Sequence, residues 1–199
     1  NPPWKGAGGD RVVRKYIKER KKKERGKKYC IQINNNELAE YFVFRTSDFC
    51  TKNTEVALVI HSTSLYNSNS KDRESSFRRY LLEEFHIKKV FELAVVRKEV
   101  FDKSNDKAIA PACVLFYKYA NGDDTNNNII THIALKPSRF FSMFKVFSVC
   151  SSDIQEVQQD RLKKYDWLWK VLVYGSYLDF NLIKRLREKP SIKNIINDR

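Results

Sequence analysis

The alternation of apolar and polar segments predicts an α/β fold. Residues 55–61 form an uninterrupted apolar run that ends in three hydroxyl residues, which is typical of a strand buried on both faces. An amphipathic helix follows, with an apolar stripe at Phe77, Tyr80, Leu81 and Phe85. Residues 90–93 are expected to form the second strand. The order strand, helix, strand predicts a βαβ unit whose first strand is central and parallel to its neighbour.

Two further strands are expected at residues 112–117 and 129–135. Residues 94–111 look like a loop, and the polar tract 121–128 indicates a turn or a mobile loop. Beyond residue 137 the apolar positions change to helical spacing, at Ile154, Val157, Leu162, Trp167, Leu168, Val171 and Leu172. Pro190 closes the last helical stretch. The pattern therefore divides the chain into residues 1–136 and a mainly helical part, residues 137–199.

The stretch before the first strand predicts two helices. One begins at Arg11, with an apolar face at Val12, Val13, Tyr16 and Ile17, and Gly26 interrupts the Lys-rich stretch that follows. The other follows three asparagines that can cap a helix, and its apolar positions are Leu38, Tyr41, Phe42 and Phe49.

Composition excludes several classes of protein. With 199 residues and 42% hydrophobic content the chain can bury a core, yet no run reaches the roughly 20 apolar residues that span a membrane. There is no signal peptide and no initiator Met, so the start looks like an internal point of a longer chain. The cysteines and histidines are scattered, which argues against a metal site, and free thiols favour a reducing cytoplasm. Kinase, protease and hydrolase motifs are absent.

The charge is concentrated in one segment. Of a formal net charge of +14, residues 11–28 contribute eleven Lys or Arg against Glu19 and Glu24, which is a net +9. Such a segment favours contact with nucleic-acid phosphates. The predicted DNA-backbone contacts are Lys15, Lys18, Arg20, Lys21, Lys22, Lys23, Arg25, Lys27 and Lys28. The alternative is a solvated helix that serves only solubility.

The first four residues, Asn1-Pro2-Pro3-Trp4, carry the most specific chemistry. Two acceptors, the Asn1 side-chain oxygen and the Pro2 carbonyl, could bind both hydrogens of an adenine amino group and stabilise the positive charge that develops on methylation. Consecutive prolines fix the backbone, and Trp4 offers a face for stacking a base rotated out of the duplex. The tetrapeptide resembles the catalytic motif of amino-group methyltransferases.

The elements after this motif, to about residue 120, are similar to adenine-specific DNA methylases of restriction-modification systems, including the large fused type. Residues 165–170 resemble sequence downstream of the methylase core in those enzymes, so residues 137–199 are expected to be a connector or the start of the DNA target-recognition region. The resemblance implies the later strands of a Rossmann-like, seven-stranded class I methyltransferase sheet with helices on both faces. It places Phe101 as a second aromatic beside the flipped base, although a core role for Phe101 fits equally. It implies double-stranded DNA as a partner.

The cofactor implied by the resemblance is S-adenosylmethionine. Its glycine-containing binding loop lies upstream of the catalytic motif in the family, so the upstream remainder of the same polypeptide is an expected partner and the fragment alone is expected to be inactive. Residues 6–9 cannot replace that loop, since no strand precedes them, and they are expected to form a hinge. Two alternatives stay open: a methyltransferase acting on RNA or protein glutamine, and a noncatalytic DNA-binding or assembly module.

Overall fold

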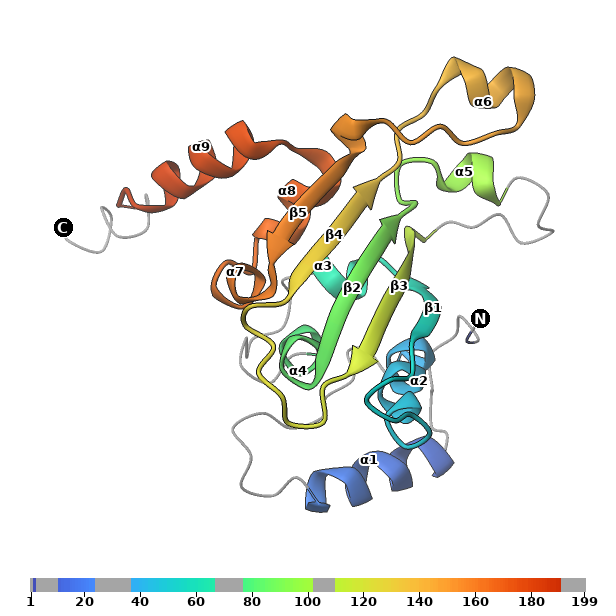
Figure 1. Cartoon of the computed structure of the whole chain (residues 1–199), viewed down its shortest axis with the longest axis vertical. Coiled ribbons are helices and arrows are strands. Elements are labelled where there is room, and N and C mark those ends of the chain that lie inside the picture. The colour runs from blue at the N-terminus through green and yellow to red at the C-terminus, as the bar shows by residue number, and fades with distance from the viewer. Residues whose placement is uncertain (1, 3–10, 24–36, 67–76, 102–109, 191–199) are drawn as a thin grey trace.

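The computed structural model describes residues 2, 11–23, 37–66, 77–101 and 110–190 of the chain. A five-stranded mixed sheet with the strand order β1-β3-β2-β4-β5 forms its centre (Figure 1). The strands are β1 (Val56–His61), β2 (Phe85–Glu92), β3 (Ala112–Tyr119), β4 (Ile129–Ala134) and β5 (Ile154–Gln158). The chain therefore has a mixed α/β fold.

The pairing of the strands gives the sheet two different edges. β2 pairs in parallel with β4, and β3 is antiparallel to both β1 and β2. The strands β1, β2 and β4 consequently run in one direction, and their last residues lie at the same side of the sheet. We call this side the carboxyl edge and the opposite side the amino edge. β5 is antiparallel to β4 and closes the far end of the strand order.

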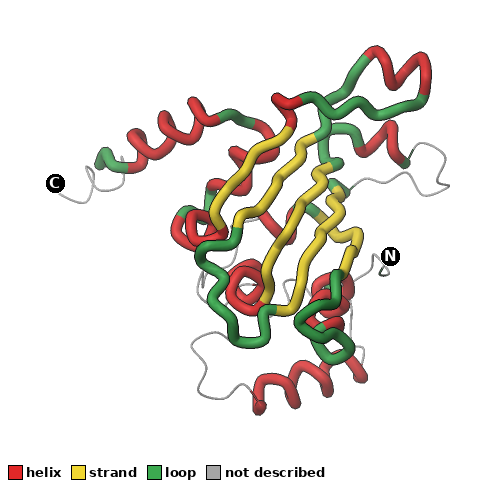
Figure 2. The backbone as a smooth tube through the Cα atoms, viewed as in Figure 1, coloured by secondary structure: helices red, strands yellow, loops and turns green. Residues whose placement is uncertain are grey.

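Helices cover one face of the sheet (Figure 2). The helices that contribute buried residues to the core on this face are α2 (Leu38–Thr46), α3 (Thr63–Tyr66), α4 (Phe77–Glu84), α7 (Gln159–Lys164) and α8 (Leu168–Tyr174). The other described helices are α1 (Arg11–Lys23), α5 (Arg97–Val100), α6 (Arg139–Phe144) and α9 (Tyr177–Arg187). A short 3-10 helix, Ser151–Asp153, precedes β5. Phe44 of α2, Leu81 of α4 and Trp169 of α8 join one core, each at most 1% exposed. On the other face Phe116, Ile129 and Ile154 stay at least 36% exposed. Helices on both faces, as the resemblance implied, are therefore not seen among the described residues.

The expectation of a central, parallel first strand was wrong. β1 is the first strand in the order and pairs antiparallel with β3, which separates it from β2. Most of its side chains are only half-buried. An apolar run indicates a strand but carries no information about its hydrogen-bonded neighbour, and here a strand from later in the chain takes the place beside it. The expected βαβ unit is thus interrupted by β3.

Phe85 was expected on the helical stripe, yet it begins β2. The change is made possible by Gln159, which is fully buried. Its amide nitrogen donates to the carbonyl oxygens of Leu82 and Phe85 at 2.6 and 2.8 Å, and its oxygen accepts from the Ile87 amide at 3.1 Å. These bonds satisfy backbone groups at the helix end and beside the bulge that follows Ile87. A residue 74 positions away in sequence thus closes the helix.

The helical assignment of Ile154 and Val157 was also wrong. Both lie in β5, opposite Ile133 and Ile130 of β4. Two apolar residues three positions apart fit either a helix or an irregularly buried strand, and here only Val157 enters the core while Ile154 is 42% exposed. The strands predicted at 112–117 and 129–135 are confirmed. The division of the chain at residue 136 stays a prediction.

The polar tract 121–128 forms a turn that is tied to the helices. The Thr125 hydroxyl donates to the Leu82 carbonyl at 2.8 Å. The Lys163 ammonium donates to Thr125 at 2.8 Å and to Asn126 at 2.7 Å. Of the two alternatives, a turn or a mobile loop, these bonds favour the turn. In the described part of the chain no helix has the length and apolar character needed to cross a membrane.

Candidate functional site

Most of the predicted catalytic motif lies outside the described residues. This holds for Asn1, Pro3 and Trp4, and on the basic segment for Arg25, Lys27 and Lys28. Pro2 is described, and its side chain is buried. The roles assigned to these residues stay predictions. The structure can be used to examine the carboxyl edge of the sheet and the helix α1.

The carboxyl edge of the sheet is the first place to look for a ligand site. In open α/β sheets ligands bind outside the carboxyl ends of the strands, where the segments leaving the strands diverge. Here a short helix follows each of the three co-directional strands: α3 after β1, α5 after β2 and α6 after β4 (Figure 1). All three segments begin at this edge.

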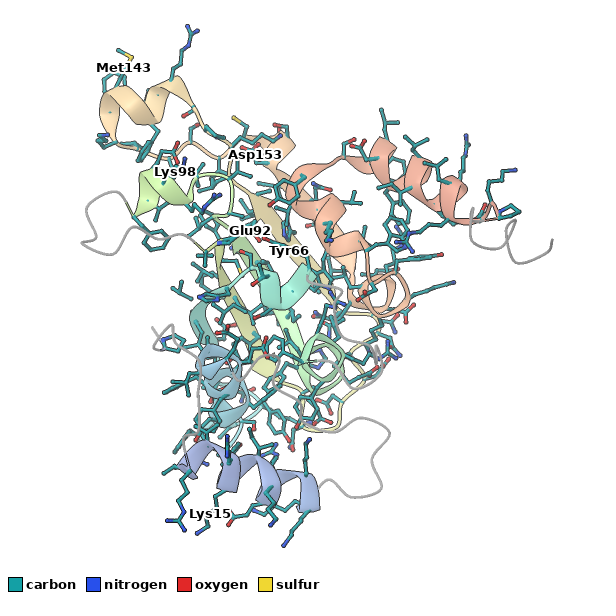
Figure 3. All side chains as sticks on the ribbon, turned by 180° about the vertical axis from the view of Figure 1, so that it is seen from behind. Lys15, Tyr66, Glu92, Lys98, Met143 and Asp153 are labelled. Atoms are coloured by element: carbon teal, nitrogen blue, oxygen red, sulfur yellow. The ribbon has the colours of Figure 1, made fainter. Side chains whose placement is uncertain are left out.

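A buried carboxyl group joins two of these strand ends. Glu92, the last residue of β2, is 1% exposed. Its Oε1 atom accepts hydrogen bonds from the Ser62 hydroxyl at 2.6 Å and from the Ala94 amide at 2.8 Å. Ser62 follows directly after β1, so the two strands are linked across β3 through one side chain. Figure 3 shows Glu92 beside Tyr66, the last residue of α3.

Burial controls the ionisation of this group. It raises the pKa of Glu92 to about 7, although the hydrogen bonds from Ser62 and Ala94 act in the opposite direction. Burial also raises the pKa of the Tyr66 hydroxyl and of the Cys113 thiol, which lies opposite Glu92 in the strand register. The raised pKa values keep the Tyr66 hydroxyl and the Cys113 thiol neutral at pH 7, whereas Glu92 is near the midpoint of its titration there. All three groups belong to the structural support of the carboxyl edge, and they offer no exposed base to a ligand.

Phe101 lies at the same edge, directly after α5. Its side chain is half-buried, and its amide donates to the Arg97 carbonyl at 3.1 Å. The preceding Val100 packs against a small apolar cluster formed by Leu93, Val96 and Leu135. This position suits a base-stacking aromatic and a packing residue alike, so the stacking role stays a prediction.

The basic helix α1 lies at the amino edge, where it packs on α2. Val13 is 5% exposed, and the Tyr16 ring meets the Tyr41 ring edge-on at 5.2 Å. The Arg45 guanidinium lies 4.9 Å from the Tyr16 ring centroid. The opposite face of α1 exposes Arg11, Lys15, Lys18 and Lys22. Figure 3 shows Lys15 and the α6 residue Met143 at opposite ends of the molecule.

Arg20 helps to hold α1 against the residues that follow α2, a role that the sequence did not indicate. Its guanidinium donates to Asp48 Oδ1 at 2.7 Å and to Ser47 Oγ at 3.2 Å, and its side chain is 17% exposed. Arg20 is one helical turn after Tyr16 and so shares its packed face. The predicted phosphate contact of Arg20 would compete with Asp48. In contrast, an open groove of about 580 Å³ is lined by Arg14, Ile17, Lys18, Lys21 and Lys22.

The sequence reasoning missed two features of the carboxyl edge. The first is the Ser62–Glu92 link, whose signal is an acidic residue between two apolar ones, Phe91 and Leu93, in a predicted strand. The second is α6, where Phe140, Met143 and Phe144 are 51%, 74% and 58% exposed. Its signal is a run of aromatic residues between two cations, Arg139 and Lys145.

The described residues also limit which cofactors the chain could hold. No group of three or more His, Cys, Asp or Glu side chains within them could hold a metal ion. Two glycines are described. Gly122 adopts a φ of 88° in the turn after β3, and a Cβ on Gly175 would lie 3.1 Å from the Val171 carbonyl oxygen. Gly175 thus serves the close packing between α8 and α9, and neither glycine forms a cofactor loop.

Comparison with known proteins shows a shared fold. No protein-family profile and no curated protein matches the chain. It is similar to a chain in a structure that addresses complex assembly and conformational transition of the type I R-M system, with 14% identity and a TM-score of 0.54. That match covers 100% of this chain and 43% of the other. A crystal structure described as a modification subunit of a type I restriction enzyme from Vibrio vulnificus YJ016 matches at 12% identity and a TM-score of 0.38. This second match covers 62% of this chain and 28% of the other, so the chain spans less than half of either protein.

Proposed function

We propose that this chain is the later-strand part of the catalytic domain of an S-adenosylmethionine-dependent DNA methyltransferase, which modifies the N6 amino group of adenine in a restriction-modification system. The observation that carries the proposal is a fold shared, over the whole length of this chain, with a chain of a type I restriction-modification system. The Asn-Pro-Pro-Trp tetrapeptide at residues 1–4 adds the chemistry.

In this proposal the residues of the chain bind and activate the target base. The Asn1 side-chain oxygen and the Pro2 carbonyl accept hydrogen bonds from the adenine amino group and stabilise the charge that develops on its nitrogen. Trp4 and Phe101 stack on the flipped ring, which has to leave the duplex before any group can reach its amino nitrogen. The position of Phe101 at the carboxyl edge supports this arrangement.

The described residues do not fit S-adenosylmethionine, because they contain no glycine loop after a strand. We therefore assign cofactor binding to an upstream remainder of the same polypeptide. The exposed cations of α1 bind the phosphates of double-stranded DNA. Since the substrate is cellular DNA, the enzyme acts in the cytoplasm.

Methylation by the polypeptide that contains this chain tests the proposal. Asn1→Ala should lower the rate of labelled methyl transfer to duplex DNA by about 100-fold or more, the scale seen when one preorganised polar group is removed. Asn127→Ala, at an exposed position between β3 and β4, is the matched control and should keep its rate. Near-normal methylation by Asn1→Ala would contradict the catalytic assignment. A labelled product other than N6-methyladenine would contradict the substrate.

A further inference from the structure

The tip of α6 exposes large apolar side chains. The Phe140 and Phe144 rings pack on each other with centroids 4.7 Å apart, and Met143 is 74% exposed. Figures 1 and 3 show α6 projecting beyond the carboxyl edge of the sheet. Contiguous exposed apolar side chains often mark an interaction surface, whereas single exposed ones need no explanation.

Several contacts anchor this tip to the rest of the fold. The Ser138 hydroxyl caps the helix by accepting from the Phe141 amide at 3.2 Å. Phe141 stacks on Phe147 at 4.2 Å, and Phe147 packs on the cluster that contains Leu93 and Leu135. The same cluster receives Val100, so α5 and α6 share one support. The outward side chains are therefore presented in a fixed arrangement.

The charge around the tip is positive. Residues 136–150 contain Lys136, Arg139 and Lys145 and no acidic residue. All three cations are exposed. Lys136 lies 3.4 Å from Asp153, and the Lys145 ammonium lies 5.4 Å from the centroid of the Phe141 ring. Lys98 of α5, labelled in Figure 3, adds another exposed cation at the carboxyl edge. This surface complements a polyanion.

Lys145 occupies a position that favours glycine. It ends α6 with a φ of 57°, and its amide donates to the Phe141 carbonyl at 2.8 Å. Left-handed backbone geometry is unfavourable for a residue with a Cβ, and helices commonly end in glycine at this place. A long cationic side chain is thus present where glycine would be less strained, which is expected if the cation has a function.

We propose that the carboxyl-edge patch, defined as Lys98, Arg139, Phe140, Met143, Phe144 and Lys145, contacts duplex DNA. Its cations bind phosphates, and its apolar tip enters the groove or a base step that opens when the target base flips. Architectural proteins insert Phe, Met and similar side chains between base steps in this way. Phe, Met and Arg are also common in protein interfaces, so a protein contact is the alternative outcome of the test. The exposed cations and the absence of acidic residues from 136–150 favour a polyanion. The inference rests on the proposed function for its choice of substrate.

The charge component is tested with Lys145→Gly in the polypeptide that contains this chain. Binding of a fluorescein-labelled duplex is followed by anisotropy over a salt series without methyl donor. The log–log slope of affinity against salt should become shallower by about 0.9, the value for one phosphate contact. The melting temperature should be unchanged or higher, because glycine suits the left-handed position. Lys184→Ala, an exposed cation on α9, is the control and should leave the slope unchanged.

The apolar component is tested with Phe144→Ala in the same assay. Affinity should fall by about fivefold or more, as expected for the loss of one aromatic contact with a base, with no change of slope. Leu182→Ala removes an equally exposed side chain, at 56% compared with 58% for Phe144, and is the control.

Two outcomes overturn the inference. One is unchanged affinity in both patch variants while their thermal melts show folded protein. The other is a Phe144→Ala variant that binds DNA normally but changes its mass in light scattering, which assigns the tip to a protein contact. Loss of binding in the patch variants together with normal methylation by Asn1→Ala would keep the DNA surface while removing the catalytic assignment. The two proposals can therefore fail separately.

Discussion

The two edges of the sheet carry cations in different ways. At the amino edge, α1 places Lys15, Lys18 and Lys22 on one face of a single helix, while Val13 is buried and Tyr16 packs on Tyr41 of α2. At the carboxyl edge, Lys98 and Lys145 come from separate segments and surround exposed aromatic rings. The first surface can be found by counting charges along the chain. The second combines one local segment, residues 139–145, with Lys98, which follows a strand parallel to the one before that segment and so lies at the same edge.

The layers beneath these surfaces differ as well. α1 is held in place partly by ion pairs at half-buried positions, such as the pair between Arg20 and Asp48. The carboxyl edge rests on Glu92, which is almost fully buried. Salt acts mainly on exposed charges, and pH acts on groups whose pKa changes on folding. We therefore expect the amino edge to respond to salt and the carboxyl edge to respond to pH.

The largest effect is expected at Glu92. Its pKa is raised from 4.5 to about 7 in the folded chain by burial. The folded state then binds more protons than the unfolded state between these values, so stability falls as pH rises through this window and levels off above it. The loss is on the order of 3 kcal/mol. Glu92→Gln cannot ionise and should remove this fall, as measured by urea unfolding at several pH values.

His132 gives the internal control for that measurement. It is fully buried in β4, and burial lowers its pKa to about 4. The folded state therefore binds fewer protons than the unfolded state between pH 4 and about 6.5, and stability rises with pH in that range. The two groups oppose each other below pH 6.5, so the decisive window for Glu92→Gln is pH 6.5 to 7.5. An unchanged slope there would show that Glu92 titrates normally.

The second effect concerns the outer face of α1. Replacing Lys15, Lys18 and Lys22 by Ala should make the salt dependence of DNA affinity shallower by up to about 2.7, which is three phosphate contacts at roughly 0.9 each. Affinity at low salt should fall about tenfold or more. Replacing Lys184, Arg185 and Lys189 by Ala removes the same charge from exposed positions on and after α9 and is the control. Equal effects of both triple variants would mean that only net charge matters.

Local sequence periodicity predicts some parts of these two regions and misses others. The apolar positions of α1 and the runs of β3 and β4 predicted those elements correctly, because one local period settles each of them. The neighbour of β1 and the end of α4 depend on β3 and on Gln159, which lie far along the chain. Local periodicity carries no information about such distant partners. The same limit applies to one member of the carboxyl-edge patch, Lys98, which lies far along the chain from the others. The remaining members fall within residues 139–145, where aromatic residues between two cations are a local signal.

A smaller effect is expected at Arg20, on the inner face of α1. Arg20→Ala should lower the free energy of unfolding by about 1 kcal/mol, since it removes hydrogen bonds to Asp48 and Ser47 at a partly buried position. The DNA salt slope should change by less than in Lys21→Ala, the exposed neighbour. Urea unfolding and the anisotropy series measure the two quantities. A full loss of about 0.9 in slope with normal stability would assign Arg20 to phosphate instead.

The smallest effect is expected at Glu19, an acidic residue on the exposed side of α1. Its carboxylate lies 4.0 Å from the Lys15 ammonium, and both side chains are more than half exposed, so the pair should contribute little to stability. Glu19→Gln should therefore leave the urea midpoint unchanged. It removes one negative charge among the cations that face the phosphates, so DNA affinity at low salt should rise slightly, and the gain should vanish at high salt. Glu188→Gln, an exposed acid after α9, is the control and should leave affinity unchanged. If Glu19→Gln instead weakens binding, the Lys15–Glu19 pair orients Lys15 for its phosphate, and α1 would then be a shaped site at the amino edge as the patch is at the carboxyl edge.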